Sequence, residues 1–120
     1  MHSNFTEAIV QLWSELGLAP PLADDLHSLQ VGEHVVHIAE RPQGHILMFI
    51  SIETELRANA QMVHEQNLFN SDTLSPIISM DESEHRWLVW NRQPILLCKT
   101  ATLRRQLEQV IDCAERFCGM

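Results

Sequence analysis

The chain has 120 residues and a mass of 13.8 kDa, which allows one domain with one hydrophobic core, because domains typically span about 100–150 residues. Its 45% hydrophobic and 20% charged residues are typical of a globular protein and exclude a disordered or fibrous one. Sixteen acidic residues against eight basic ones give a net charge of −8. This charge argues against nucleic acids and anionic membranes as partners, since both repel an acidic surface. We expect a single domain over residues 1–120.

The sequence also argues against membrane insertion and secretion. No apolar run approaches the roughly 20 residues that span a bilayer. The N-terminal stretch MHSNFTEAIVQLWSEL is polar, acidic and periodic, whereas a signal peptide begins with basic residues followed by an apolar run. Cys98, Cys113 and Cys118 are odd in number and form no CxxC pair, which favours reduced, packed thiols over a disulfide framework or a zinc site. We expect a cytoplasmic protein.

A first helix is predicted over residues 5–16. Asn4 and Glu7 are typical of a capping box, and Gly17 stands where a helix often ends in the left-handed conformation. Prolines 20 and 21 cannot continue a helix, so a loop follows. The apolar stripe has helical spacing and consists of Phe5, Ile9, Leu12, Trp13 and Leu16.

Residues 29–52 change to a β-rich pattern that is broken only at residues 41–44, which predicts a hairpin with Gly44 in the left-handed region. The register that continues from this turn pairs Ile38 with Met48 and Ala39 with Leu47. Both faces of the strand over residues 45–52 are then apolar. One face of a small antiparallel sheet is normally polar, so this strand is expected to be covered on both sides.

The second half of the chain predicts a helix, a hairpin and a final helix. Residues 54–67 return to a helical period, with a narrow apolar face. Residues 74–80 and 85–90 predict two strands around an acidic turn, after which residues 91–94 break the pattern and residues 95–98 are expected to be extended. Residues 102–118 carry the clearest helical stripe, with Thr100 or Thr102 as N-cap. The fold class is therefore α+β.

No catalytic or metal-binding constellation is evident. His34 and His37 lie three apart in a predicted strand and point to opposite faces, so they cannot easily share one ion. Cys98 or Cys113 could meet a histidine in the folded chain, but packed core thiols are favoured for the cysteines of the final helix. No glycine-rich phosphate loop is present. We therefore expect no metal, no cofactor and no catalysis.

The apolar residues exceed what a small core needs. They include the three tryptophans, at positions 13, 87 and 90, and the two-sided strand over residues 45–52. Tryptophan is enriched at interfaces, and a standard contact removes about 800 Å² per partner from water. We expect a homodimer.

The combination of length, acidity and element order resembles the class I chaperones of bacterial type III secretion systems, a Tir-chaperone-like family of small acidic homodimers with the order α-β-β-β-α-β-β-α. The chain departs from the usual pattern in lacking a glycine in the 81–84 turn and in carrying two tryptophans in the strand that follows. The features that carry the resemblance are a first helix ending in Leu12-Trp13-Ser14-Glu15-Leu16-Gly17, the 29–52 segment, a middle helix ending near Asn67-Leu68-Phe69, the 74–90 hairpin, and a last helix from Leu103 to Phe117.

The resemblance implies an antiparallel twisted sheet packed on helices. It also implies a non-enzymatic chaperone of the bacterial cytoplasm that holds the N-terminal region of a secreted effector extended, non-globular and competent for secretion. By similarity, the dimer would use the middle helix and second hairpin, at Leu56, Ala60, Val63, Trp87 and Trp90. The residues expected to face the effector are Phe5, Leu12, Trp13, Leu16, Ile46, Met48 and Ile50.

Two alternatives stay open at this point. The chain could be a stable adaptor or structural subunit of a bacterial complex, with an exposed strand that binds one permanent partner. It could also be a small α+β enzyme whose Cys/His site is assembled only by the fold.

Overall fold

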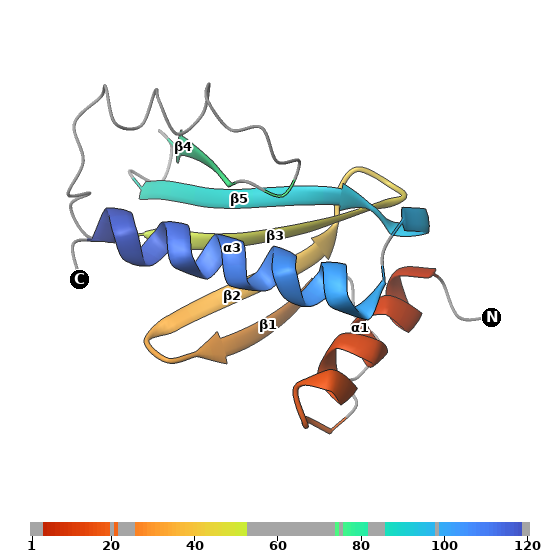
Figure 1. Cartoon of the computed structure of the whole chain (residues 1–120). Helices are drawn as coiled ribbons and strands as arrows, with labels where there is room; N and C mark the ends of the chain where they lie inside the picture. The colour runs from red at the N-terminus through yellow and green to blue at the C-terminus, as the bar shows by residue number, and fades with distance from the viewer. Residues whose placement is uncertain are drawn as a thin grey trace.

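A computed structural model of the chain describes residues 4–19, 21, 26–52, 74, 76–81, 86–97 and 99–118. The order of elements is the predicted α+β order (Figure 1). The helix predicted over residues 54–67 lies outside the described residues. The elements are α1 (Asn4–Glu15), β1 (Leu26–Val31), β2 (His34–Glu40), β3 (His45–Ile52), β4 (Ile77–Asp81), β5 (Arg86–Pro94), the 3-10 helix η1 (Ile95–Leu97) and α3 (Thr100–Cys118).

The strands form one antiparallel sheet in the order β1-β2-β3-β5-β4. The β2–β3 hairpin has the predicted register, with Ile38 opposite Met48 and Ala39 opposite Leu47. At its turn, the Arg41 amide donates to the His45 carbonyl at 3.1 Å, and Gly44 has a φ of 85°, which is a conformation that glycine adopts without steric cost. The predicted hairpin is confirmed.

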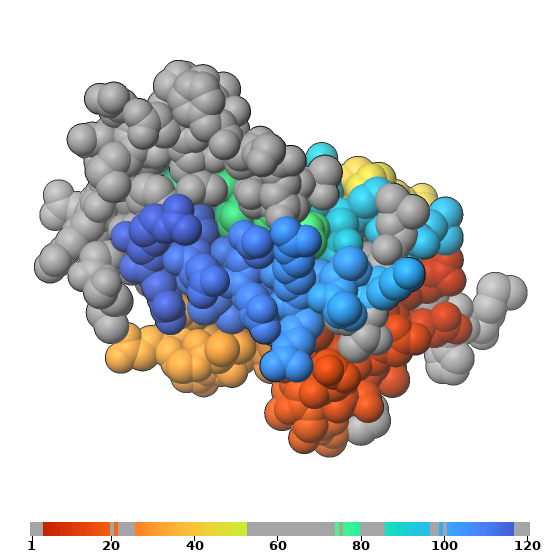
Figure 2. Space-filling view, viewed as in Figure 1, coloured from red at the N-terminus to blue at the C-terminus, as the bar shows by residue number. Residues whose placement is uncertain are grey.

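Both α1 and α3 pack on the same face of the sheet (Figure 1). The space-filling view shows this side of the molecule, where α3 and α1 lie over the strands (Figure 2). In β3 the burial alternates strictly: Ile46, Met48 and Ile50 are buried in the hydrophobic core, whereas Leu47 and Phe49 are half-buried on the opposite face. The alternation follows from the two-residue period of a strand.

Helix α1 begins and ends one residue before the predicted span of 5–16, and Gly17 ends it as predicted. Gly17 has a φ of 74°, its amide donates to the Ser14 carbonyl at 3.0 Å, and the Leu18 amide donates to the Trp13 carbonyl at 2.9 Å. These two bonds form a Schellman motif, which satisfies carbonyls that the last helical turn leaves unpaired. The buried His27 of β1 then lies against α1, with its ring centroid 5.8 Å from that of Trp13.

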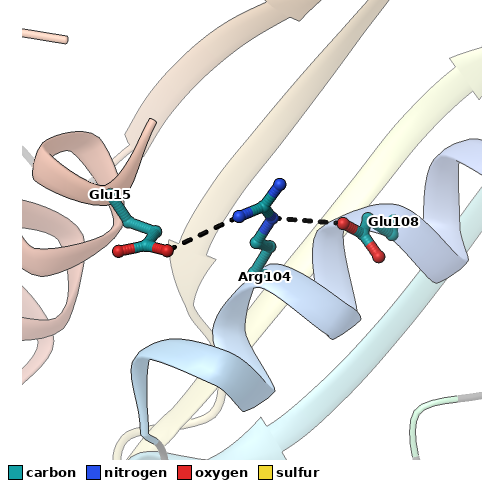
Figure 3. Close-up of polar contacts among 3 residues, drawn as sticks. All are labelled: Glu15, Arg104 and Glu108. Atoms are coloured by element: carbon teal, nitrogen blue, oxygen red, sulfur yellow. Dashed lines mark hydrogen bonds and ion pairs between the residues drawn. The ribbon is translucent and has the colours of Figure 1, made fainter. Parts of the chain in front are cut away.

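An arginine joins the two helices at the surface. Arg104 Nη1 of α3 lies 3.5 Å from Glu15 Oε1 of α1, and Arg104 Nε lies 3.2 Å from Glu108 Oε1 (Figure 3). All three side chains are largely exposed, so the network contributes at most about 1 kcal/mol per pair. The packing of α1 beside α3 therefore rests mainly on the hydrophobic core that the two helices share.

A buried amide cluster joins α3 to the sheet. Gln106 is fully buried. Its Nε2 donates to the carbonyls of Ile46 and Asn91 at 3.0 and 3.3 Å, and its Oε1 accepts a 2.7 Å bond from Gln93 Nε2. Asn91 Nδ2 donates to the carbonyls of Gln106 and Leu74, both at 2.9 Å. We call Asn91, Gln93 and Gln106 the amide cluster.

The amide cluster explains why one prediction is wrong. The sequence predicts that residues 91–94 break the strand, but β5 continues to Pro94. The polar side chains of Asn91 and Gln93 face the core side, where α3 supplies the hydrogen-bond partners that a buried amide needs. The residue pattern within the strand cannot reveal this partner, because Gln106 lies on a helix 13 to 15 residues further along the chain.

The connection into α3 also differs from the prediction. Residues 95–97 form a 3-10 turn and are not extended, and the Ile95 amide donates to the Gly44 carbonyl at 2.9 Å. Helix α3 then starts at Thr100. Thr102 Oγ1 accepts a bond from the Lys99 amide at 2.7 Å and donates to the Lys99 carbonyl at 2.8 Å, so Thr102 caps the helix from within its first turn. Neither of the described helices α1 and α3 has the length and apolarity needed to cross a membrane.

We predict that Gln106→Leu lowers the free energy of unfolding by about 2–4 kcal/mol, because it removes the donor to the buried carbonyls of Ile46 and Asn91 and an acceptor of the Gln93 amide. Urea denaturation followed by circular dichroism measures this loss. Gln11→Leu is the matched control, because Gln11 is exposed on α1, and it should change the stability by no more than about 0.5 kcal/mol. Equal effects of the two substitutions would show that the cluster adds no stability.

Candidate functional site

The sheet face opposite α1 and α3 is apolar. It carries Leu47 and Phe49 of β3 and Leu88 and Trp90 of β5, all half-buried. Among the described elements, both long helices lie on the other face. An apolar sheet face without such cover is a surface of the kind that binds a partner.

These residues line a groove with a volume of about 620 Å³, which we call the open-face groove. Its floor crosses four strands: Leu26 of β1 lies opposite Ala39 of β2, Ala39 opposite Leu47 of β3, and Leu47 opposite Arg92 of β5. The complete lining consists of Leu26, Ala39, Arg41, Pro42, Leu47, Phe49, Arg86, Leu88, Trp90 and Arg92.

The centre of this face is aromatic and held in place by polar contacts. Phe49 lies opposite Trp90, whose Nε1 donates to Ser79 Oγ at 3.1 Å. The ring of His37 lies 5.0 Å from that of Phe49, and His37 Nδ1 is hydrogen-bonded to Ser28 Oγ at 2.9 Å. Because these contacts fix the rings before a partner binds, little side-chain entropy would be lost on binding.

One edge of the sheet lies next to the groove. Strand β1 is an outer strand, and its sequence LHSLQV contains no Lys, Arg, Asp, Glu or Pro, the residues that usually block the addition of another strand. Leu26 is 47% exposed, and Val35 on the neighbouring β2 is 42% exposed. The edge and the groove therefore form a continuous surface suited to an extended peptide.

The structure places most of the residues expected to face the effector inside the protomer. Six are buried in the hydrophobic core, on the side of α1 and α3, and Leu16 is partly buried against it. Their apolar character is explained by core packing. Contact with an effector at these positions stays a prediction. The more exposed apolar side chains belong to the alternate residues of the strands, which point to the opposite face of the sheet. The six buried residues are Phe5, Leu12, Trp13, Ile46, Met48 and Ile50.

The residues expected at a dimer contact fall into two groups. Leu56, Ala60 and Val63 lie outside the described residues. Trp87 and Trp90 are three residues apart on β5 and therefore lie on opposite faces: Trp87 packs against the core, and Trp90 lines the open-face groove. A contact through one face of the sheet would include only one of the two.

The candidate catalytic and metal-binding residues do not assemble in the described part of the chain. Cys113 is buried in the core, as predicted for a packed thiol, and Cys98 lies outside the described residues. His34 Nε2 lies 4.0 Å from Glu115 of α3, whereas His37 stacks on Phe49 across the other face, so the two histidines point apart as predicted. No group of three potential metal ligands occurs among the described residues.

Of the residues that line the open-face groove, the sequence-predicted sites include only Trp90, which the family resemblance assigns to the dimer contact. The hairpin register places Leu47 beside Ala39, and the two-residue period places Phe49 on the same face, so the pattern did identify them as one set. It could not show that neither α1 nor α3 covers this set, because that depends on where the helices pack. The arginines of the lining gave no signal along the chain, since only the folded sheet places Arg41 in the groove that Arg86 and Arg92 of β5 also line.

Comparisons with known proteins agree with this fold. The sequence profile of the Tir chaperone protein (CesT) family matches residues 7–117. The YopE regulator of Yersinia pestis is 36% identical over 115 residues, covering 95% of this chain and 88% of that protein. The chain therefore belongs to the Tir chaperone protein (CesT) family.

Two solved structures are similar along nearly the whole chain. A chain of the ExoT–SpcS complex from Pseudomonas aeruginosa has a TM-score of 0.87 and 39% identity, with 98% of this chain and 99% of that chain covered. The structure of the Yersinia pestis type III secretion chaperone SycH, in complex with a stable fragment of YscM2, has a TM-score of 0.81 and 19% identity, with 94% and 98% covered. At 19% identity, the similarity to the SycH structure shows that the two chains share a fold.

We predict that Met48→Ala lowers the free energy of unfolding by about 2–5 kcal/mol, because it leaves a cavity in the core. Leu47 is adjacent to Met48 but lies on the open face. Leu47→Ala should lower the free energy of unfolding by about 1 kcal/mol or less, since Leu47 is only half-buried. Urea denaturation of both variants checks the difference. A larger loss for Leu47→Ala would show that the face assigned here as open is packed.

Proposed function

We propose that the chain is a chaperone that binds the N-terminal region of a type III secreted effector in extended, non-globular form and keeps it competent for secretion. The observation that carries this proposal is the open-face groove, an apolar surface on the side of the sheet that neither α1 nor α3 covers, in a member of a chaperone family. Membership of that family, and the solved relatives bound to other proteins, support the assignment.

The geometry supports a mechanism in two parts. An extended segment of the effector pairs its backbone with the uncharged edge strand β1, and alternate apolar side chains of the effector enter the open-face groove beyond Leu26. Each 100 Å² of apolar surface removed from water contributes about 2.5 kcal/mol, part of which is offset by the entropy lost when the segment becomes ordered.

This mechanism needs no chemical step. The binding energy comes from backbone hydrogen bonds and apolar burial, so the proposal includes neither ATP hydrolysis nor catalysis, and it requires no cofactor. It places the chain in the bacterial cytoplasm, where an effector waits before export. The net charge of −8 would keep the unloaded chaperone from associating through its exposed apolar face.

We also propose that the chaperone works as a homodimer. The contact would use the segment that carries Leu56, Ala60 and Val63, together with Trp87 of the second hairpin. The family resemblance also implies Trp90, but Trp90 lines the open-face groove on the opposite face, so we assign it to the effector. Trp87 is partly buried, which leaves it some area to place against a second copy. A standard dimer would bury about 800 Å² on each protomer.

Where a secreted protein is encoded beside this chain's gene, we predict that its co-expression with the chain yields a complex in which the N-terminal region of the secreted protein is extended. Limited proteolysis and the dispersion of its NMR resonances measure the extension. Deletion of the chaperone gene should abolish secretion of that protein, and restoring the gene should recover it.

Other outcomes would contradict the chaperone proposal. A folded N-terminal region in the complex would exclude the extended form. A complex that persists through export without release would instead identify a permanent adaptor subunit. No binding of that neighbouring protein by the chaperone would overturn the proposed pairing.

We predict that Val63→Glu converts the dimer to a monomer, because a buried charge in an apolar contact costs several kcal/mol. Analytical ultracentrifugation measures the mass, and circular dichroism confirms that the variant is folded. Val10→Glu is the matched control, because Val10 is exposed on α1, and it should leave the dimer intact. A folded Val63→Glu dimer would remove this residue from the contact.

A further inference from the structure

The lining of the open-face groove is basic as well as apolar, although the chain is acidic. Three of its eight Lys and Arg residues, Arg41, Arg86 and Arg92, line the groove. Asp and Glu are absent from the lining formed by the described residues, while the whole chain carries sixteen of them. The groove is therefore a positive site on a negative protein, and this local charge needs an explanation beyond apolar burial.

Strand pairing concentrates two of the arginines at one end of the groove. Arg92 on β5 lies opposite Leu47, and Arg41 follows β2 two residues after Ala39, which is itself opposite Leu47. Two strand spacings across β3, about 10 Å, and an offset of two residues along the strands, about 7 Å, place the backbones of Arg41 and Arg92 about 12 Å apart. Both side chains reach the same groove, and both residues are exposed.

These two guanidinium groups are not neutralised within the described part of the chain. Arg92 lies over the Trp90 ring, with its Cζ 5.7 Å from the ring centroid, and this contact leaves the N–H donors of its guanidinium free for an anion. The described structure contains no ion pair for either Arg41 or Arg92. On the helix side, by contrast, Arg104 has both Glu15 and Glu108 as partners.

We propose that the open-face groove selects an effector segment in which an acidic side chain follows the apolar ones, and that Arg41 and Arg92 bind its carboxylate. This inference rests on the proposed function and adds to it the chemistry of the recognised segment. Apolar side chains occupy the floor between Phe49 and Leu88, and the carboxylate accepts hydrogen bonds at the Arg41 and Arg92 end.

The size of the groove favours a short segment over a second copy of the chain. A volume of about 620 Å³ is within the range of about 300–1,000 Å³ typical of sites for small ligands. A stable dimer needs about 800 Å² of surface on each partner. The pair of arginines also favours one direction of the bound segment, the direction that brings its carboxylate to Arg41 and Arg92.

The test uses the N-terminal fragment of the secreted protein encoded beside this chain's gene. The chaperone variant with both Arg41→Gln and Arg92→Gln should bind this fragment about tenfold more weakly at about 0.05 M NaCl, and the difference should shrink at about 0.5 M NaCl because salt screens the charges. Fluorescence anisotropy measures the Kd. Arg104→Gln is the matched control, since it removes the same charge from the helix side, and it should leave the Kd within about twofold.

A second arm locates the carboxylate. In a peptide array that tiles the fragment, one Asp→Gln or Glu→Gln substitution should reduce binding to the wild-type chaperone and have no effect with the double variant, as a double-mutant cycle requires for a direct pair.

Equal Kd values for the double variant and Arg104→Gln would overturn this inference and leave the chaperone function standing. Occupation of the groove by a second copy of the chain, seen as cross-links between Trp90 of two protomers, would also overturn it. Failure of the wild-type chaperone to bind the fragment at all would instead contradict the proposed function.

Discussion

The two-residue period of the central strands β3 and β5 divides their side chains into two apolar sets, one on each face of the sheet. The rest of the structure depends on which of these sets packs against the helices. Ile46, Met48 and Ile50 receive α1 and α3 and become core. Leu47 and Phe49 receive no described helix and form the open-face groove. A strand that is apolar on both faces thus provides stability on one side and a binding surface on the other.

The amide cluster holds α3 in place on the core face of the sheet. Gln106 bonds to β3 through the Ile46 carbonyl and to β5 through the Asn91 carbonyl and the Gln93 side chain. Apolar contacts alone would allow α3 to slide over the sheet, because they are not directional. Buried amides have definite donor and acceptor positions, so the hydrogen bonds of Gln106 fix the placement of the helix on the sheet. The groove keeps its shape because the helix on the other face is fixed.

Charge is distributed to match the two faces. On the helix side, Arg104 is paired with carboxylates and joins α1 to α3. On the open face, Arg41 and Arg92 line an apolar groove without such partners among the described residues. A chaperone that is acidic elsewhere repels other acidic chains at a distance, so the local positive end of the groove gives a segment with a carboxylate one site at which it is attracted.

The sequence by itself determined the local structure: the ends of α1, the β2–β3 register and the final helix follow from helical and strand periods, capping residues and Gly44. It also supported the family, through length, acidity and element order. Only the tertiary structure decided that Met48 is core and Phe49 open, and that Asn91 and Gln93 continue a strand. The reason is physical: alternation sorts residues into two faces, but the helices that cover one of them, and the Gln106 amide that satisfies the buried polar groups, come from distant parts of the chain.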